Sequence, residues 1–144
     1  MDELAELTYR RVHRAPRELV FQCMTVPAHL TMFWGPAGTT TPLDGIIVDL
    51  RVGGAFETVM VNDIDGSQYT MRAVYDEVTP PARLVWREAE SGMVTTITFN
   101  DLGDGTTEVV THQTNVPPAY RSPEARAGFT TSLDRFDDYI GGLR

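Results

Sequence analysis

The clearest structural signature in this chain of 144 residues is the stretch Ser122-Pro-Glu-Ala-Arg-Ala-Gly-Phe-Thr-Thr-Ser-Leu-Asp-Arg-Phe-Asp-Asp-Tyr-Ile140. Ser122 is a suitable N-cap, and Pro123 suits the first helical position, where its missing N–H is harmless. Apolar side chains follow at spacings of 4, 4, 3 and 4 residues, at Ala125, Phe129, Leu133, Phe136 and Ile140. This spacing predicts a long amphipathic helix with one apolar stripe, ending at the pair Gly141-Gly142.

The opposite face of this helix is polar and is expected to face solvent; it carries Arg126, Asp134, Asp137 and Asp138. The apolar stripe needs an apolar surface to lie on, and a β-sheet supplies one. Between residues 43 and 115 the sequence changes to short runs rich in β-branched and aromatic residues. The predicted strands span residues 43–50, 55–62, 68–78, 83–89, 93–101 and 106–115. Each connection is short and contains Gly or Pro, which predicts an antiparallel meander.

The residues before the sheet complete a single domain over residues 1–144. Residues 6–14 predict a first strand, and two short helices follow, one from Ala15-Pro16 and one ending at Gly35-Pro36. The predicted fold is α+β: a seven-stranded antiparallel sheet, two short helices after the first strand, and a long C-terminal helix on the sheet. Phe129, at the centre of the helical stripe, is expected to be buried between helix and sheet.

The composition excludes several classes of function. Twelve Arg and no Lys stand against twenty acidic residues, for a formal net charge of −8. This balance argues against a nucleic-acid partner, and the absence of Lys excludes a phosphate-binding or Schiff-base lysine. Cys23 is the only cysteine, so no internal disulfide forms, and no apolar run approaches the ~20 residues needed to span a bilayer. We expect a cytoplasmic protein, monomeric or homodimeric, with no membrane partner.

The sequence predicts no metal site and no cofactor. The His residues show neither His-x-His nor His-Glu-x-x-His spacing, and a lone Cys cannot build a structural zinc site. Asp63-Ile-Asp-Gly66 is interpreted as a turn, and Gly53-Gly54 lacks the spacing of a dinucleotide-binding loop. Cys23 falls on the buried stripe of its helix, which argues against a nucleophilic role.

Several motifs occur in the order seen in a known family. They are Arg11–Phe21, Trp34-Gly-Pro36, Asp49–Phe56, Glu77–Leu84, Phe99–Thr106 and Gly128-Phe129. On these motifs the chain resembles the START-like (SRPBCC, helix-grip) superfamily, in the branch named for the activator of heat-shock protein 90 ATPase. The resemblance implies a deeply curved sheet wrapped around the C-terminal helix, with a cavity between them. His13 departs from the family pattern, which usually has an apolar residue there.

Strand alternation and the resemblance together suggest a wall for that cavity. The candidate ligand-binding side chains are Trp34, Met60, Tyr69, Met71, Trp86 and Phe99, with Phe129 and Phe136 above them. Met and aromatic side chains suit a small hydrophobic or aromatic ligand. The alternative is that the same side chains fill a core without any cavity.

Polar groups for such a pocket are expected on the first strand. Tyr9, Arg11 and His13 share one face of that strand, a set that can polarise a carbonyl or orient a carboxylate. The alternative is a solvent-exposed polar strand face. His29 is interpreted as a surface or capping residue, and His112 can face either side of its strand.

Three functions are compatible with these features. The first is a small-molecule binding domain with an apolar cavity. The second is a polyketide cyclase- or hydrolase-like enzyme that uses Tyr9, Arg11 or His13 in the same cavity, and the third is an interaction module that activates a chaperone ATPase. The sequence favours the first, because it shows no acid–base pair at a recognisable spacing and is expected to be a lone domain without a second chaperone-contacting module. No catalytic residue is therefore assigned.

Overall fold

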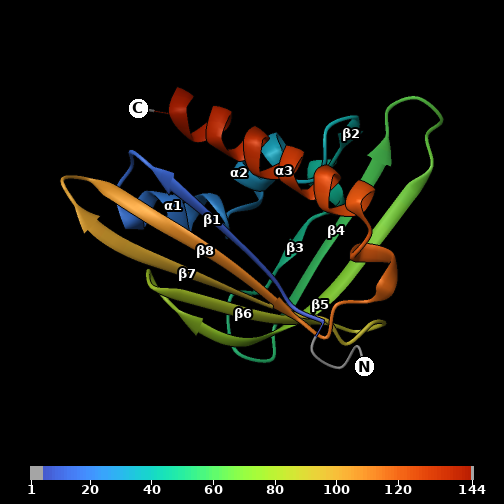
Figure 1. The fold of residues 1–144 in the computed structure, drawn as a ribbon, viewed down its shortest axis with the longest axis horizontal. Coiled ribbons are helices and arrows are strands. Elements are labelled where there is room, and N and C mark those ends of the chain that lie inside the picture. Colours follow the sequence, from blue (N-terminus) through green and yellow to red (C-terminus); the bar gives the residue numbers. More distant parts are fainter. Residues whose placement is uncertain (1–4, 144) are drawn as a thin grey trace.

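The structure is a computed structural model that describes residues 5–143. Within that range eight strands form one antiparallel sheet in the order β1-β8-β7-β6-β5-β4-β2, and β3 also pairs with β4, on the edge that β2 uses (Figure 1). The strands are β1 (Leu7–His13), β2 (Thr39–Thr40), β3 (Ile47–Val48), β4 (Ala55–Asn62), β5 (Gln68–Thr79), β6 (Arg83–Glu88), β7 (Val94–Gly103) and β8 (Thr106–Thr114). Each long strand from β4 to β8 pairs with its neighbour in sequence, as the short connections predict.

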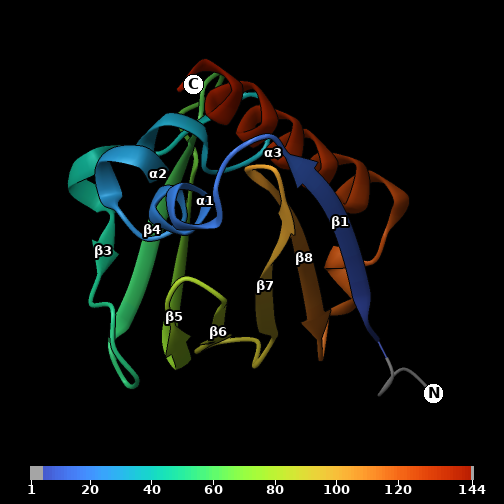
Figure 2. The same ribbon diagram turned by 90° about the vertical axis from the view of Figure 1, so that its left-hand side faces the viewer.

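The sheet is strongly curved, and the long helix α3 (Pro123–Gly142) lies across its concave side (Figure 1). Seen along the trough in Figure 2, β4 and β5 form one side, β1 and β8 the other, and α3 crosses above them. The short helices α1 (Arg17–Cys23) and α2 (Pro27–Phe33) cover one end of the trough. This arrangement confirms the α+β fold with a curved sheet wrapped around a C-terminal helix.

The edge of the sheet next to β4 differs from the prediction. Residues 43–45, predicted as part of a strand over 43–50, form a 3-10 turn, and only Ile47 and Val48 of that stretch pair with β4. The added strand β2 brings the sheet to eight strands rather than seven. Pro42 and the Asp44-Gly45 pair account for the turn, since Pro lacks an amide donor and Asp-Gly favours bent backbone.

The start of α3 follows the prediction, and its end does not. Ser122 caps the helix, because its hydroxyl accepts a hydrogen bond of 3.1 Å from the Ala125 amide. Gly141 and Gly142 keep helical backbone, and neither has the positive φ of a glycine stop. The helix therefore runs two residues further than predicted and is capped at Leu143.

The core is concentrated where α1, α2 and the C-terminal half of α3 meet the sheet. Phe136 and Ile140 of α3 are each 3% exposed. Phe129, which precedes Phe136 in the same helix, is only half-buried, so the prediction that it is buried between helix and sheet is wrong. Cys23 lies in this core at 0% exposure, and burial raises the pKa of its thiol to about 11, in keeping with its place on a buried helical stripe.

Candidate functional site

A cavity of about 560 Å³, here called the central cavity, separates the N-terminal half of α3 from the sheet. Helix α3 contributes Ala125, Gly128, Phe129, Ser132, Leu133 and Phe136 to its roof. The loop after α2 contributes Trp34, whose ring packs against Phe56 and Trp86 at centroid distances of 5.4 and 6.3 Å. Phe129 is only half-buried because its ring borders the central cavity rather than sheet side chains.

Most of the predicted wall residues lie around this cavity. Those in its wall are Tyr9, Trp34, Met60, Tyr69, Met71, Trp86, Phe129 and Phe136. Phe99, predicted to line the cavity, does not: it is 1% exposed and packs edge-to-face on Phe21 of α1, at a centroid distance of 5.3 Å. Phe99 faces the concave side as its strand parity predicts, but α1 fills the trough at that point and separates it from the cavity.

The sequence analysis missed several other wall residues. They include Leu7, Met24, Glu88, Met93, Thr95, Thr111, Gln113 and Tyr120. Glu88 could have been predicted from the sequence, because it alternates with Leu84 and Trp86 on the inward face of β6. No sequence pattern predicted Tyr120, since it lies in the short 3-10 turn η2 (Pro118–Tyr120), between β8 and α3.

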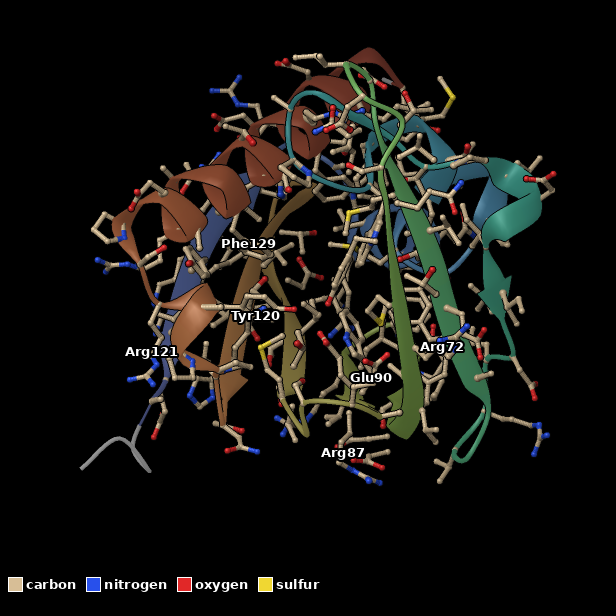
Figure 3. The ribbon with its side chains drawn as sticks, turned by 90° about the vertical axis from the view of Figure 1, so that its right-hand side faces the viewer. Arg72, Arg87, Glu90, Tyr120, Arg121 and Phe129 are labelled. Carbon is tan, nitrogen blue, oxygen red and sulfur yellow. The ribbon has the colours of Figure 1, made fainter. Side chains whose placement is uncertain are left out.

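Two tyrosines meet at the mouth of the cavity. The hydroxyl oxygens of Tyr69 on β5 and Tyr120 on η2 lie 2.6 Å apart and share a hydrogen bond. Figure 3 shows Tyr120 and Phe129 directed from η2 and α3 toward the space above the sheet, while Arg121 lies outside it. Burial, followed by the hydrogen bond to Tyr120, raises the pKa of Tyr69. This pair joins the helical roof to the β5 side of the mouth.

Two of the predicted polar residues lie elsewhere. Arg11 and His13 belong to a cluster between β1 and the C-terminal half of α3, in which Arg11 donates to Asp134 at 2.9 Å and also to Asp137. His13 is 4% exposed, and its Nδ1 lies 3.2 Å from Asp137. Asp134 remains exposed at 60%, as expected of the polar helix face, while both it and the less exposed Asp137 pair with Arg11 of β1.

This polar cluster lies beside a second pocket of about 10 Å³, too small for an organic ligand. Tyr9 borders both pockets; its ring packs on Phe129 at a centroid distance of 4.7 Å. The prediction that Arg11 and His13 line the central cavity is therefore wrong, because their partners on α3 hold them outside it.

The environment of His13 predicts a pH-dependent stability. Burial lowers the pKa of His13, and the charge of Arg11 adds to this, whereas Asp137 opposes it. Below a pH of about 6.5 the unfolded chain binds a proton at His13 that the folded protein does not, so the free energy of unfolding falls as the pH is lowered. Replacing His13 with Leu should flatten this fall by up to about 1.4 kcal/mol per pH unit.

Urea unfolding between pH 7.5 and pH 5 measures this slope. Val12→Leu is the matched control, because Val12 is the neighbouring residue on the outward face of β1 and is 58% exposed. Equal slopes in His13→Leu and wild type would show that His13 does not titrate differently on folding.

The other two histidines lie outside the central cavity. His29 of α2 is half-buried, with its Nδ1 2.6 Å from the Tyr139 hydroxyl of α3. His112 contacts Glu6, with 2.7 Å between Nε2 and the carboxylate, on the outward face of the sheet. Among residues 5–143, no three His, Cys, Asp or Glu side chains gather as a metal site would require. Over the same residues, no helix is long and apolar enough to cross a membrane.

A curved antiparallel sheet around a C-terminal helix, with a cavity between the two, defines the helix-grip (START-like) class. The family model described as "Activator of Hsp90 ATPase homolog 1-like protein" matches residues 14–141. The chain therefore belongs to this family. No curated protein matches the chain significantly.

Solved structures share the fold over almost the whole chain. A protein from Chromobacterium violaceum is 25% identical, with 92% of this chain and 95% of that chain covered and a TM-score of 0.83. A protein from Nitrosomonas europaea is 26% identical, with 99% and 97% covered and a TM-score of 0.81. An HSP90 activator from Plasmodium falciparum is 19% identical, with 94% and 96% covered and a TM-score of 0.69. At that last identity the likeness extends to the fold alone.

Proposed function

We propose that this protein binds a small, predominantly apolar molecule in the central cavity. The observation that carries the proposal is the cavity itself, whose volume of about 560 Å³ is within the ~300–1,000 Å³ of typical ligand sites. Its wall is made largely of Met, Trp, Tyr and Phe side chains. Such side chains offer large contact areas and adapt to irregular apolar shapes.

The cavity also distinguishes this part of the molecule from an ordinary core. Protein interiors are packed as densely as organic crystals, with few voids larger than one water molecule. A space of this size below α3 loses the contacts that a filled core would gain, and an apolar ligand restores them. The half-buried Phe129 in the roof is consistent with a space that an apolar ligand can fill.

The two alternatives have weaker support. An enzyme that uses Tyr9, Arg11 or His13 finds only Tyr9 in the cavity wall, because Arg11 and His13 are engaged by Asp134 and Asp137 outside it. Chaperone activation is the role of the relative from Plasmodium falciparum, which is described as an HSP90 activator and whose likeness to this chain extends to the fold alone. Binding requires only the cavity and is the function proposed.

A neutral apolar dye, N-phenyl-1-naphthylamine, tests this proposal. Wild-type protein should bind it saturably at one site, and the intrinsic fluorescence should change because both tryptophans, Trp34 and Trp86, line the cavity. Met71→Trp fills the space from β5 and should weaken dye binding about tenfold or more, since each tenfold corresponds to ~1.4 kcal/mol. Arg72→Trp adds the same side chain to the exposed outer face of β5 and should leave the affinity unchanged (Figure 3).

Circular dichroism should show that both variants keep the wild-type fold. If Met71→Trp binds the dye as tightly as wild type, or wild type does not bind it, the proposal is wrong and the domain is better described as an interaction scaffold. Native mass spectrometry of the purified protein then identifies any molecule that it retains.

A further inference from the structure

Among residues 5–143, Glu88 is the only acidic or basic side chain in the wall of the central cavity. It is the last residue of β6 and alternates with Leu84 and Trp86, which are both buried on the concave side. Its partner across the sheet is Ala73 of β5, and Glu88 itself lines the central cavity. A carboxylate thus forms part of an otherwise uncharged, mainly apolar wall.

Over residues 5–143, no basic side chain forms an ion pair with this carboxylate. Within the described residues no Arg or His lines the cavity. Burial raises the pKa of Glu88, the nearby Glu90 raises it further, and a hydrogen bond with Ser91 opposes the shift. The carboxylate is therefore held where a positive charge would stabilise it.

The position of Glu88 gives the cavity a polar end and an apolar end. Burial, the hydrogen bond to Tyr120 and the charge of Glu88 all raise the pKa of Tyr69, so the carboxyl lies close to the tyrosine pair at the mouth. The far end of the cavity is lined by apolar side chains that include Met24, Phe33, Ile97, Leu133 and Phe136. A ligand that matches both ends is an amphiphile with its polar group toward the mouth.

The charge of that polar group follows from electrostatics. A carboxylate or phosphate would enter without any basic partner in the wall and would be repelled by Glu88. A neutral group such as a hydroxyl can donate a hydrogen bond to the carboxylate, but it buries the carboxylate further without neutralising its charge, which costs free energy. A protonated amine forms a charge-assisted hydrogen bond with the carboxylate, and the rings of Tyr69 and Tyr120 add cation–π attraction. The net charge of −8 favours the approach of a cation.

Building on the proposed function, we infer that the ligand of the central cavity is an amphiphilic amine, with an apolar body beneath α3 and a protonated amino group on the Glu88 carboxylate. The inference concerns the chemical class of the ligand: a primary or secondary amine attached to an aliphatic or aromatic body that the cavity can enclose.

Three ligands with the same tail test this inference. Decylamine, decanol and decanoate compete, below their micelle concentrations, with bound N-phenyl-1-naphthylamine at pH 7.5 and 150 mM salt. In wild-type protein decylamine should bind at least about tenfold more tightly than decanol, and decanoate should bind most weakly. Glu88→Gln should bring decylamine to within about threefold of decanol and strengthen decanoate, each affinity being calculated from the dye affinity measured for the same variant.

Glu18→Gln is the matched control. Glu18 is exposed on α1 and does not line the central cavity, and its substitution changes the net charge of the protein by the same amount. It should preserve the preference for decylamine. A preference that survives Glu88→Gln, or wild-type binding of decanol as tight as that of decylamine, would overturn the inference and leave the proposed function standing. Failure of wild type to bind the dye and all three ligands would overturn the proposed function itself, and this inference with it.

Discussion

Replacing Gly54 with alanine should lower the free energy of unfolding by about 3 kcal/mol or more, enough to leave much of the protein unfolded. A Cβ atom at Gly54 would lie 2.0 Å from the carbonyl oxygen of Asp49 and 2.9 Å from its carbonyl carbon. Both are backbone atoms, and two hydrogen bonds hold the Asp49 backbone in place. The Asp49 amide donates to the Ala55 carbonyl at 2.8 Å, and the Asp49 carbonyl accepts from the Arg51 amide at 2.8 Å. The clash therefore has no side chain that can move aside.

The neighbouring Gly53 provides the matched comparison. Its φ of +83° disfavours alanine, but a Cβ there meets nothing within 4 Å. Gly53→Ala should cost about 1–2 kcal/mol, the penalty for one left-handed residue. Urea unfolding followed by tryptophan fluorescence measures both variants. If Gly54→Ala is as stable as Gly53→Ala, the close approach of the Asp49 backbone does not constrain this position.

Phe136→Ala should lower the free energy of unfolding by about 3–5 kcal/mol, because its ring is almost fully removed from water and packs on core rings, although one side of it borders the central cavity. Phe136 is 3% exposed and packs against Phe33 and His13 at centroid distances of 4.6 and 4.9 Å. Phe129→Ala should cost only about 1–2 kcal/mol, since its ring already borders empty space and less of its surface is removed from water.

Urea unfolding of the two alanine variants side by side tests this difference. Equal losses would mean that the two halves of α3 pack on the sheet alike, contrary to the structure. The expected difference divides α3 by role: its C-terminal half anchors the helix to the sheet, and its N-terminal half roofs the central cavity.

The sequence by itself determined the parts of this protein that depend on local pattern. Strand alternation placed Met71 and Trp86 on the concave side, and short Gly- and Pro-containing connections indicated antiparallel neighbours. Ser122 marked the start of α3 because an N-cap bonds to an amide only three residues away. The family resemblance pointed to a cavity, and composition indicated which side chains would surround it.

The tertiary structure decided what each inward-facing side chain meets. Phe99 and Met71 both face inward, yet α1 covers the first and the second faces the central cavity. Arg11 and Asp137 are 126 residues apart in the chain, so no local pattern revealed that they pair. Gly54 resembles any turn glycine in sequence until the Asp49 backbone lies against it. Periodicity determines only the direction of a side chain, whereas the element opposite it is brought there by the folding of distant segments, and that element decides between core, cavity and ion pair.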